Sequence, residues 1–316
     1  MSKPIGWVLI PRLKVQNLNA VSSPMTWGFP SPTAFTGFVD SLQRRLPSCF
    51  DARFGGTGIV CHHFAPQVSR PTQFGPQAFH LTRNPLNRHG KSPSFVEEGR
   101  AHAVVSLLIE VGGFAGAPDP FLAAVINAAH AMRLAGGSIL PCYAPRSLPQ
   151  YFECFDDPQA NTEAFAGWRS AILPGSALVQ REDLLIARLQ ELRLEQPGAD
   201  ALDALLDCTR VNIRGTQSDP KDPSKATWQF RTHPGWLVPI PVGYAGISPL
   251  YPPGAVRNTR DPEKPFRFVE SLYSLGQWLS PARVNNPDEI MWRSVADSTA
   301  GIYTSVNRYA DSFHSA

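Results

Sequence analysis

The densest group of side chains that could bind a charged ligand lies in the stretch HLTRNPLNRHGKSPSFVEEGR, from His80 to Arg100. The stretch runs from one expected strand to another, so it could form a long hairpin with these side chains at its tip. Arginine and lysine neutralise the phosphates of a nucleic acid, and asparagine adds polar contacts. The pattern therefore predicts contact with nucleic acid, while the alternative is a solvated loop with ordinary charges. The candidate residues are Arg83, Asn84, Asn87, Arg88 and Lys91.

A second candidate is the glycine-rich stretch RLAGGS, from Arg133 to Ser138, which follows an expected helix. Small residues at such a place let backbone N–H groups approach a phosphate closely. The stretch is not a P-loop, because it lacks the GK(S/T) ending and the helix precedes the glycines instead of following them. Its alternative role is that of a stop signal at the C-terminus of the helix. The candidate contacts are Arg133, Gly136, Gly137 and Ser138.

A third candidate combines basic and aromatic residues towards the end of the chain. Bases stack on aromatic rings while arginines hold the phosphates, so this combination is typical of single-stranded nucleic-acid binding. The alternative is a helix with buried aromatic side chains and a solvated charged face, which we favour for Trp278. The basic candidates are Arg257, Arg260, Arg267 and Arg283, with Lys264 among them, and the aromatic ones are Phe266, Tyr273 and Trp278.

The histidines are the side chains that could act in catalysis. A ribonuclease that cuts by attack of the 2′-hydroxyl needs a general base such as histidine beside the scissile phosphate. His62 and His63 are neighbours on an expected strand, so they point to opposite faces and do not easily share a metal ion. The chain has no HExxH, GxSxG or cysteine-based motif. We therefore predict no catalytic residue, metal or cofactor. The histidines that qualify by type only are His62, His63, His80, His89 and His102.

The loop NLNAVSSPMTWGFPSPTAFTG, from Asn17 to Gly37, lies between an expected strand and an expected helix. Loops of this length inside a compact domain are mostly functional or disordered, and the aromatic residues of this loop argue against disorder. We expect the loop to lie across a ligand surface. Trp27 and Phe29 either stack on a base or anchor the loop in the core, and Trp27 is kept as a candidate contact. The polar candidates are Asn17, Asn19, Ser22 and Ser23.

Six elements in the first half of the chain follow one another in a βαββαβ order. This order predicts an α+β fold with a ferredoxin-like, RRM-type domain, whose sheet face often binds single-stranded RNA. Many unrelated proteins share that fold. The strands are expected at Gly6 to Val15, at Thr57 to Phe64, at His102 to Val111 and after RLAGGS. The first helix is expected to begin after the cap Ser31, with Pro32 at its first position, and to end before Pro47. The second helix is expected to begin at Asp119-Pro120.

The second half is expected to be more helical and irregular. Its predicted elements are a helix from Ala177 to Arg193, a short helix from Asp200 to about Cys208, a solvated loop at 215–225, an edge strand from Trp236 to Tyr244 and a helix from Phe266 to Leu279. We therefore expect an RRM-like domain at 1–142 with a thumb-like hairpin at about 78–101, a helical insertion at 143–225 and a C-terminal part at 226–316 that completes the domain.

Composition narrows the class of protein. With 316 residues, of which 43% are hydrophobic, the chain can build one large domain or two smaller ones. The five cysteines are odd in number and show no CxxC spacing, which predicts reduced thiols. No apolar run is long enough for a membrane span, and the first residues lack the pattern of a signal peptide, so we expect a cytoplasmic protein.

The distribution of charge indicates two kinds of surface. The stretch from Asp119 to Arg210 has a net charge of −5, so the rest of the chain, with the whole at +3, carries +8. Basic flanks suit an anionic polymer, and an acidic middle suits a protein neighbour. The alternative is ordinary variation of the surface.

Longer blocks of sequence identify a family. The blocks are PRLKVQNLNAVSSPMTWGFPSPTAFTGFV, LTRNPLNR with VEEGRAH, AMRLAGGSILP, GWLVPIPVGY with SPLY, and RFVESLYSLGQWLSP. The chain resembles in these blocks the second Csy subunit of type I-F CRISPR surveillance complexes (Cascade), a Cas-five protein of the RAMP superfamily. The resemblance runs in order from residue 11 to residue 281, and the stretches at 143–174 and 215–225 contribute nothing to it.

The resemblance implies a non-catalytic subunit that binds the 5′ handle of the guide RNA (crRNA) in antiviral defence. It also implies pairing with the large Csy subunit, contact with the first backbone Csy subunit, and contact with target DNA only through the complex. The stretch from His80 to Arg100 would be the RAMP thumb, and RLAGGS would be the glycine-rich loop against RNA. Two alternatives stay open, a metal-independent endoribonuclease that processes guide precursors and a stand-alone single-stranded RNA-binding module.

Overall fold

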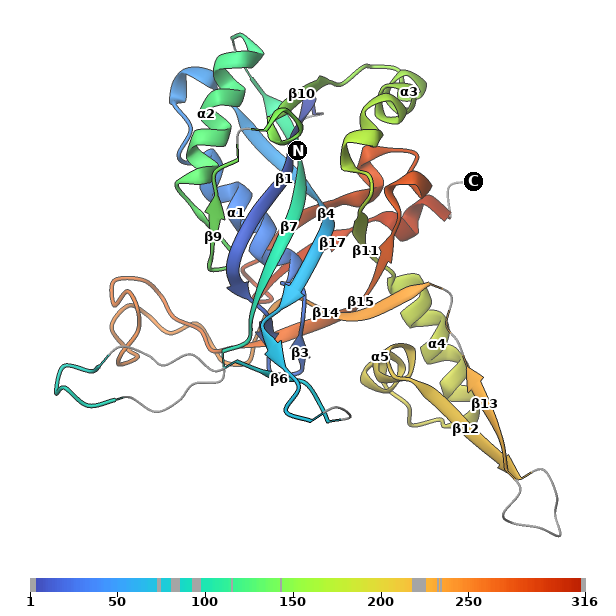
Figure 1. Cartoon of the computed structure of the whole chain (residues 1–316). Coiled ribbons are helices and arrows are strands. Elements are labelled where there is room, and N and C mark those ends of the chain that lie inside the picture. Colours follow the sequence, from blue (N-terminus) through green and yellow to red (C-terminus); the bar gives the residue numbers. More distant parts are fainter. Residues whose placement is uncertain are drawn as a thin grey trace.

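The computed structural model describes residues 4–72, 75–80, 86–92, 98–114, 116–142, 144–217, 226–231, 233 and 235–313. This part of the chain forms five α-helices, one large antiparallel sheet of 11 strands and three small two-stranded sheets (Figure 1). The mixed α+β class expected from the sequence is therefore confirmed. Within the described ranges, no helix is long and apolar enough to cross a membrane.

The elements have the following bounds. The helices are α1 (Pro32–Gln43), α2 (Pro118–His130), α3 (Pro158–Trp168), α4 (Glu182–Glu195) and α5 (Ala201–Thr209). The strands of the large sheet are β1 (Gly6–Asn19), β4 (Arg53–Pro66), β7 (Arg100–Gly113), β8 (Arg133–Leu134), β9 (Gly137–Leu140), β10 (Gln150–Glu153), β11 (Ser176–Gln180), β14 (Trp236–Gly246), β15 (Val269–Leu279), β16 (Met291–Asp297) and β17 (Ile302–Asn307). The small sheets pair β2 (Val21–Ser23) with β3 (Thr26–Trp27), β5 (Val68–Ser69) with β6 (Ala78–Phe79), and β12 (Asn212–Gln217) with β13 (Ala226–Arg231).

Four strands of the N-terminal half lie side by side in the order β4, β7, β1 and β9, and each neighbouring pair is antiparallel. Helices α1 and α2 pack in one core against the same face of these strands. Helix α1 begins where the sequence predicts. The hydroxyl of Ser31 accepts a hydrogen bond from the backbone N–H of Thr33 (3.2 Å), and Pro32 occupies the first turn.

Strand β4 joins this half to the C-terminal half of the chain. One edge of β4 pairs with β7, and the other edge pairs with β16 at Thr57 and Gly58 and with β11 at Val60 and Cys61. Because β11 also pairs with β15, the strands β4, β11, β15, β14, β17 and β16 form a closed ring of backbone pairing. Closure of this kind leaves few strand edges without partners.

Hydrogen bonds across the ring connect strands that are not neighbours in it. The indole Nε1 of fully buried Trp292 on β16 donates to the carbonyl of Leu178 on β11 (2.8 Å). Gln180 on β11 and Asn307 on β17 exchange two bonds of 3.0 Å, each from a backbone N–H to the side-chain oxygen of the other residue. Both residues are buried, and an unpaired amide would be costly there. The polar groups inside the ring therefore define which strands meet.

The central strands are covered on both faces at one end only. There, Trp7 and Leu9 of β1 pack against Phe165 and Trp168 of α3, while α1 and α2 cover the opposite face. A strand that is buried on both faces loses its alternation of polar and apolar residues, which explains the apolar run in β7. Towards the other end, β1 and β7 alternate buried with exposed or half-buried side chains. This half of the sheet has one open face.

Of two helices predicted for the second half, the first is wrong only at its start and the second is wrong altogether. The residues from Ala177 to Gln180 belong to β11, and helix α4 begins only at Glu182. The stretch from Phe266 to Leu279 is not helical, because its residues from Val269 onwards form β15 between β11 and β14. Its leucines recur at helical spacing, but pairing with strands on both edges overrides that local signal.

Other predictions for this half are confirmed at least in part. Asp200 caps α5 through a capping box with Asp203. Strand β14 pairs with β15 along its whole length and with β17 only from Gly243 to Ala245, so its first half is an edge. The expected loop at 215–225 overlaps the β12–β13 hairpin, and its residues 218–225 lie outside the described part of the chain. The proposed domain boundaries stay a prediction.

Glu110 on β7 binds the N-terminal half of the chain to the C-terminal half. Its carboxylate is 7% exposed, accepts a hydrogen bond from the backbone N–H of Gly56 (2.5 Å) and forms an ion pair with Arg293 on β16. We expect Glu110→Ala to lower the free energy of unfolding by about 2–4 kcal/mol, because a buried N–H and a partly buried guanidinium lose their acceptor.

The matched control is Asp288→Ala, which removes the exposed partner of the same guanidinium. We expect this variant to cost less than about 1 kcal/mol, since solvent screens an exposed ion pair. Urea unfolding measures both values, and equal losses for the two variants would contradict the role given to Glu110.

Candidate nucleic-acid interface

A row of side chains crosses the open half of the sheet. The strand register places Lys14 on β1 between Leu140 on β9 and Val104 on β7, and it places Val104 beside His63 on β4. Lys14, His63 and Leu140 are exposed, and Val104 is half-buried. Neighbouring strands are about 4.8 Å apart, so the row spans roughly 15 Å. A cation, an imidazole and apolar surface in one flat array suit the backbone and bases of a single-stranded nucleic acid.

A second row lies two residues further along the same face. Gln16 on β1 pairs with Ser138 on β9, and His102 on β7 pairs with Ala65 on β4. Among the sequence candidates for binding, only Ser138 belongs to these two rows. Lys14 and Gln16 were missed, although their alternation with buried Leu13 and Val15 is a signal that could have identified them.

The glycine-rich stretch RLAGGS forms a tight hairpin. Helix α2 ends at His130, and β8 and β9 pair across a two-residue turn. The turn residues Ala135 and Gly136 have φ values of +47° and +76°. Positive φ at both central residues is the geometry of the turn that joins two antiparallel strands most tightly. The alternative role as a helix stop therefore gives way to a hairpin turn.

Gly137 is required because β9 lies very close to β1. A Cβ at this position would stand 2.8 Å from the carbonyl oxygen of Gln16 and from the nitrogen of Leu18. The glycine thus serves strand packing. The exposed side chains that the hairpin presents to a ligand belong to Arg133 and Ser138.

Three of the polar candidates in the N-terminal loop shape the loop itself. The side chain of Asn19 accepts from the backbone N–H of Val21 (3.1 Å) and donates to its carbonyl (2.7 Å). The hydroxyl of Ser22 accepts from the backbone N–H of Ser31 (3.1 Å), and Ser23 is buried. Side chains used in this way hold the backbone in its turns, and they are poorly placed to bind a ligand at the same time.

Asn17 is the exposed polar candidate of this loop region. Its φ is +56°, and its backbone N–H donates to Nδ1 of His102 (3.3 Å). Its side-chain oxygen accepts from the amide of Gln67, and its carbonyl lies 3.5 Å from the guanidinium of Arg100. Arg100 is in turn paired with Glu98 (2.5 Å). Asn17 therefore belongs to a polar cluster at the edge of the open face.

The two aromatic residues of the loop have different surroundings. Phe29 stacks on Phe35 of α1 (5.4 Å between ring centroids) and meets Trp278 edge-on (4.9 Å). Trp27 is 66% exposed and contacts Phe79 edge-on (5.6 Å). Phe29 is thus the anchor of the loop, and Trp27 presents its ring to solvent.

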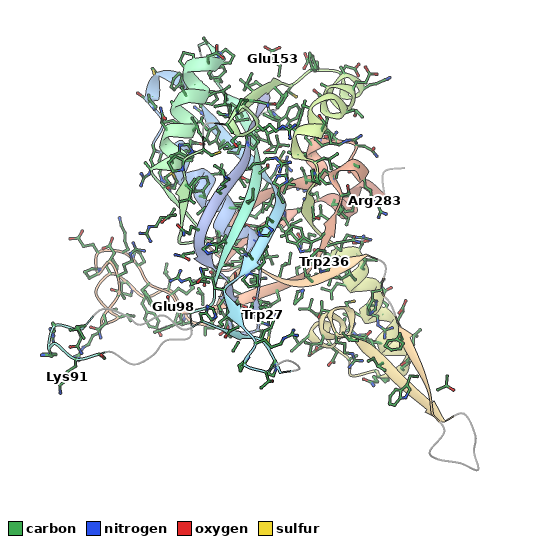
Figure 2. The ribbon with its side chains drawn as sticks, in the orientation of Figure 1. Trp27, Lys91, Glu98, Glu153, Trp236 and Arg283 are labelled. Carbon is green, nitrogen blue, oxygen red and sulfur yellow. The ribbon has the colours of Figure 1, made fainter. Side chains whose placement is uncertain are left out.

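A cleft of about 500 Å³ opens between this loop and β14. Figure 2 shows Trp27 at the lower end of the central strands and Trp236 to their right. Trp236 is 65% exposed and lies opposite half-buried Trp278 in the β14–β15 register, with 6.2 Å between the ring centroids. Trp236 was missed, because it stands in a continuous apolar run and no local signal separates it from its neighbours. The aromatic side chains that line the cleft are Trp27, Phe29, His62, His63, Phe64, Trp236 and Trp278.

His62 is held by hydrogen bonds in the wall of the cleft. Its Nδ1 lies 2.6 Å from the carbonyl of Pro174, and its Nε2 lies 2.6 Å from the hydroxyl of Ser106. A carbonyl only accepts, so Nδ1 carries the proton and Nε2 accepts from Ser106. Burial lowers the pKa of His62, as does the nearby charge of Arg12, and both outweigh the bond to Pro174. The imidazole is therefore neutral at pH 7.

Cys61, its neighbour on β4, is also unsuited to chemistry. Burial raises the pKa of the Cys61 thiol to about 11, so the thiol is protonated at neutral pH. Among the residues with described positions, no three of His, Cys, Asp and Glu lie close enough to hold a metal ion.

Three of the residues predicted at the hairpin tip, Asn87, Arg88 and Lys91, lie in one exposed turn. The side-chain oxygen of Asn87 accepts from the backbone N–H groups of His89 (2.9 Å) and Lys91 (3.1 Å), which closes an exposed turn that includes Arg88. Lys91 projects to one side of the molecule in Figure 2. Arg83 and Asn84 lie outside the described residues.

The basic candidates near the C-terminus are not gathered at one place. Arg257 and Arg260 are exposed in the excursion between β14 and β15. Arg267 packs so closely on Gly301 that a Cβ there would collide with the guanidinium, which indicates a structural role. Arg283 is exposed but lies well away from Trp27 in Figure 2. Of these four arginines, Arg257 and Arg260 lie in the excursion, which extends away from the large sheet in Figure 1.

Comparison with known proteins identifies similar sequences over nearly the whole chain. A family model described as "CRISPR-associated protein (Cas_Csy2)" matches residues 8–305. A protein named "CRISPR-associated protein Csy2" from Pseudomonas aeruginosa (strain UCBPP-PA14) is 48% identical over 314 residues, which cover 96% of this chain and 95% of that protein. The matched range includes the open sheet face, the glycine hairpin and the cleft.

The neutral state of His62 makes stability depend on pH. Its pKa in the folded chain is lowered, so the unfolded chain binds a proton first as the pH falls. The stability that His62 contributes is fully present above about pH 6.5, the ordinary histidine value, and is lost as the pH falls towards the folded pKa. We expect the melting temperature to decrease as the pH is lowered from about 7.5 to about 5.5. The melting temperature of His62→Gln should decrease less steeply over the same range.

His63→Gln is the control, because it replaces an exposed imidazole next to His62 and leaves the two hydrogen bonds of His62 in place. We expect it to keep the slope of the unchanged protein. Thermal melts across the pH range measure all three proteins, and parallel slopes for the two variants would contradict the role of His62.

Proposed function

The chain belongs to the Csy2 family of CRISPR-associated proteins, and we propose that it binds the 5′ handle of a guide RNA in a type I-F surveillance complex. Membership of the family confirms the family that the sequence blocks predicted. It also makes the protein a component of a CRISPR system. The RNA contact, the handle and the neighbouring subunits are our proposal.

The open half of the sheet face is the observation that carries the proposal. It combines Lys14, which can neutralise a phosphate, with the amide of Gln16 and the imidazole of His63. The glycine hairpin places Ser138 directly beside Gln16. Single-stranded RNA binds to such surfaces through phosphates, sugar hydroxyls and the faces of its bases.

The order of strands supports a ferredoxin-like, RRM-type unit in the N-terminal half. Strands β4, β7, β1 and β9 are antiparallel neighbours, and both connecting helices cover one face. In folds of this kind the uncovered face is the RNA platform. We assign the turn around Asn87, Arg88 and Lys91 to the tip of the RAMP thumb, and we assign Arg257 and Arg260 to further phosphate contacts.

We propose two protein neighbours, the large Csy subunit and the first backbone Csy subunit, with target DNA reached only through the assembled complex. The acidic middle of the chain supports a surface for a protein neighbour. Part of its charge is used within the chain, since Asp207 pairs with Arg188 (2.6 Å) and Asp183 pairs with Arg181 (2.8 Å). Both pairs join residues within the acidic stretch, so its net charge of −5 is left for a neighbour.

We propose that the subunit does not cut RNA. Both nitrogens of His62 are occupied by hydrogen bonds, and the Cys61 thiol is protonated. The endoribonuclease alternative would need an exposed histidine such as His63 or His89. The alternative of a stand-alone RNA-binding module would need no partner.

Removal of one charge tests the sheet face. We expect Lys14→Ala to weaken binding of guide RNA by the assembled complex several-fold. The slope of log affinity against log salt should fall by about 0.7, because one phosphate contact with a single strand is lost. Arg45→Ala is the matched control, since Arg45 is an exposed cation beyond the end of α1, on the opposite face. Filter binding at several salt concentrations measures both, and the sheet face is not the RNA surface if the two variants bind alike.

A second experiment separates the alternatives. Replacing His63 and His89 by alanine, with His62 left in place for the fold, should leave processing of guide precursors intact. Loss of cleavage with retained binding would favour the nuclease. The protein should also bind handle-bearing RNA far better with its large partner than alone, and equal binding in both conditions would favour the stand-alone module.

A further inference from the structure

We propose that the cleft between the Trp27 loop and β14 takes one unpaired base of the bound RNA. The donors of that base face the proline-bearing edge of β14. This inference rests on the proposed function, because it assumes that the ligand is RNA. The cleft volume of about 500 Å³ falls within the roughly 300–1,000 Å³ of small-ligand sites.

Exposed rings make the cleft a stacking site. Trp27 and Trp236 are both about two-thirds exposed, at 66% and 65%. Trp278 also lines the cleft, where Phe29 packs edge-on against it and strand pairing holds it opposite Trp236. A base that stacks on rings held in this way loses little free energy to ordering of the protein.

At its two prolines, this edge of β14 offers carbonyl acceptors without N–H donors. Its first half pairs only with β15, so the other edge faces the cleft. The Pro241 carbonyl points to that edge, because it accepts from the hydroxyl of Ser31 (2.7 Å). Pro239, two residues earlier and exposed, directs its carbonyl to the same side.

This pattern of hydrogen-bonding groups selects among ligands. Neither Pro239 nor Pro241 has an N–H, so a strand from a partner protein cannot pair regularly with this edge. The amino group or ring N–H of a base needs only a carbonyl acceptor. The edge therefore favours a base over an added strand.

His63 connects the cleft with the open sheet face. It lines the cleft and stands in the same row as Lys14, two strands or roughly 10 Å away. The described residues that line the cleft include no Lys, Arg, Asp or Glu, so a phosphate finds no cation there. The RNA backbone stays on the sheet beside Lys14, and a base turns past His63 into the cleft.

A fluorescent base tests the inference in the assembled complex. Guide RNAs carry 2-aminopurine at one unpaired position at a time, and stacking quenches its fluorescence. We expect one position to be quenched by the unchanged complex. Trp236→Ala should abolish that quenching and weaken RNA binding roughly 5- to 160-fold, which is the range for loss of one base–aromatic stack. Trp236→Phe keeps a ring and should restore most of both.

Trp228→Ala is the matched control. Trp228 on β13 is 64% exposed, and it does not line the cleft. We expect this variant to leave the quenching and the affinity unchanged.

Three outcomes would overturn the inference. If Trp236→Ala keeps the quenching and the affinity while Lys14→Ala still weakens binding, the base site is wrong and the proposed function stands. If Trp236→Ala releases a protein subunit and leaves the RNA signal unchanged, the cleft holds a side chain of that subunit. If neither Lys14→Ala nor Trp236→Ala affects RNA binding, the proposed function fails as well.

Discussion

The shared edge of β4 is the constraint on which the rest of the structure depends. A strand edge offers one row of backbone donors and acceptors, and β4 divides this row between β16 and β11 within the stretch from Thr57 to Cys61. The two strands must diverge at that point, and the ring follows from their divergence. Trp292 lies where they separate and bonds β16 to β11 through its indole N–H. Loss of either pairing would open the ring.

The cleft is a product of this closure. The ring brings β14 against the loop that precedes α1, although the two segments are far apart in the sequence. One hydroxyl links them, since Ser31 both caps α1 and donates to the carbonyl of Pro241. Helix start and strand position are thus coupled through a single side chain. The site is assembled by tertiary pairing, whereas a local motif would have been visible in one stretch of sequence.

Local chemistry could be predicted from the sequence, and long-range pairing could not. The caps Ser31 and Asp200 bond to residues beside them, so their signals are complete within a few positions. The leucines of β15 recur at helical spacing and so predict a helix, but pairing with β11 and β14 makes this stretch a strand. The sequence predicts that Gly137 contacts a phosphate, whereas the structure requires glycine there because the backbone of β1 leaves no room for a Cβ. Likewise, Ser23 belongs to the predicted binding loop, yet its burial depends on packing that the sequence does not display.

The order of the ring strands along the chain also affects when the ring can close during synthesis. Strands β16 and β17 come last in the ring, and they leave the ribosome after every other strand. Contacts between distant segments form late in folding, because long stretches of chain must first be brought together. The ring, of which β4 is one strand, cannot close until residues up to Asn307 have been synthesised. A nascent or truncated subunit therefore lacks the closed ring, and the topology itself delays closure until translation has passed the last strand.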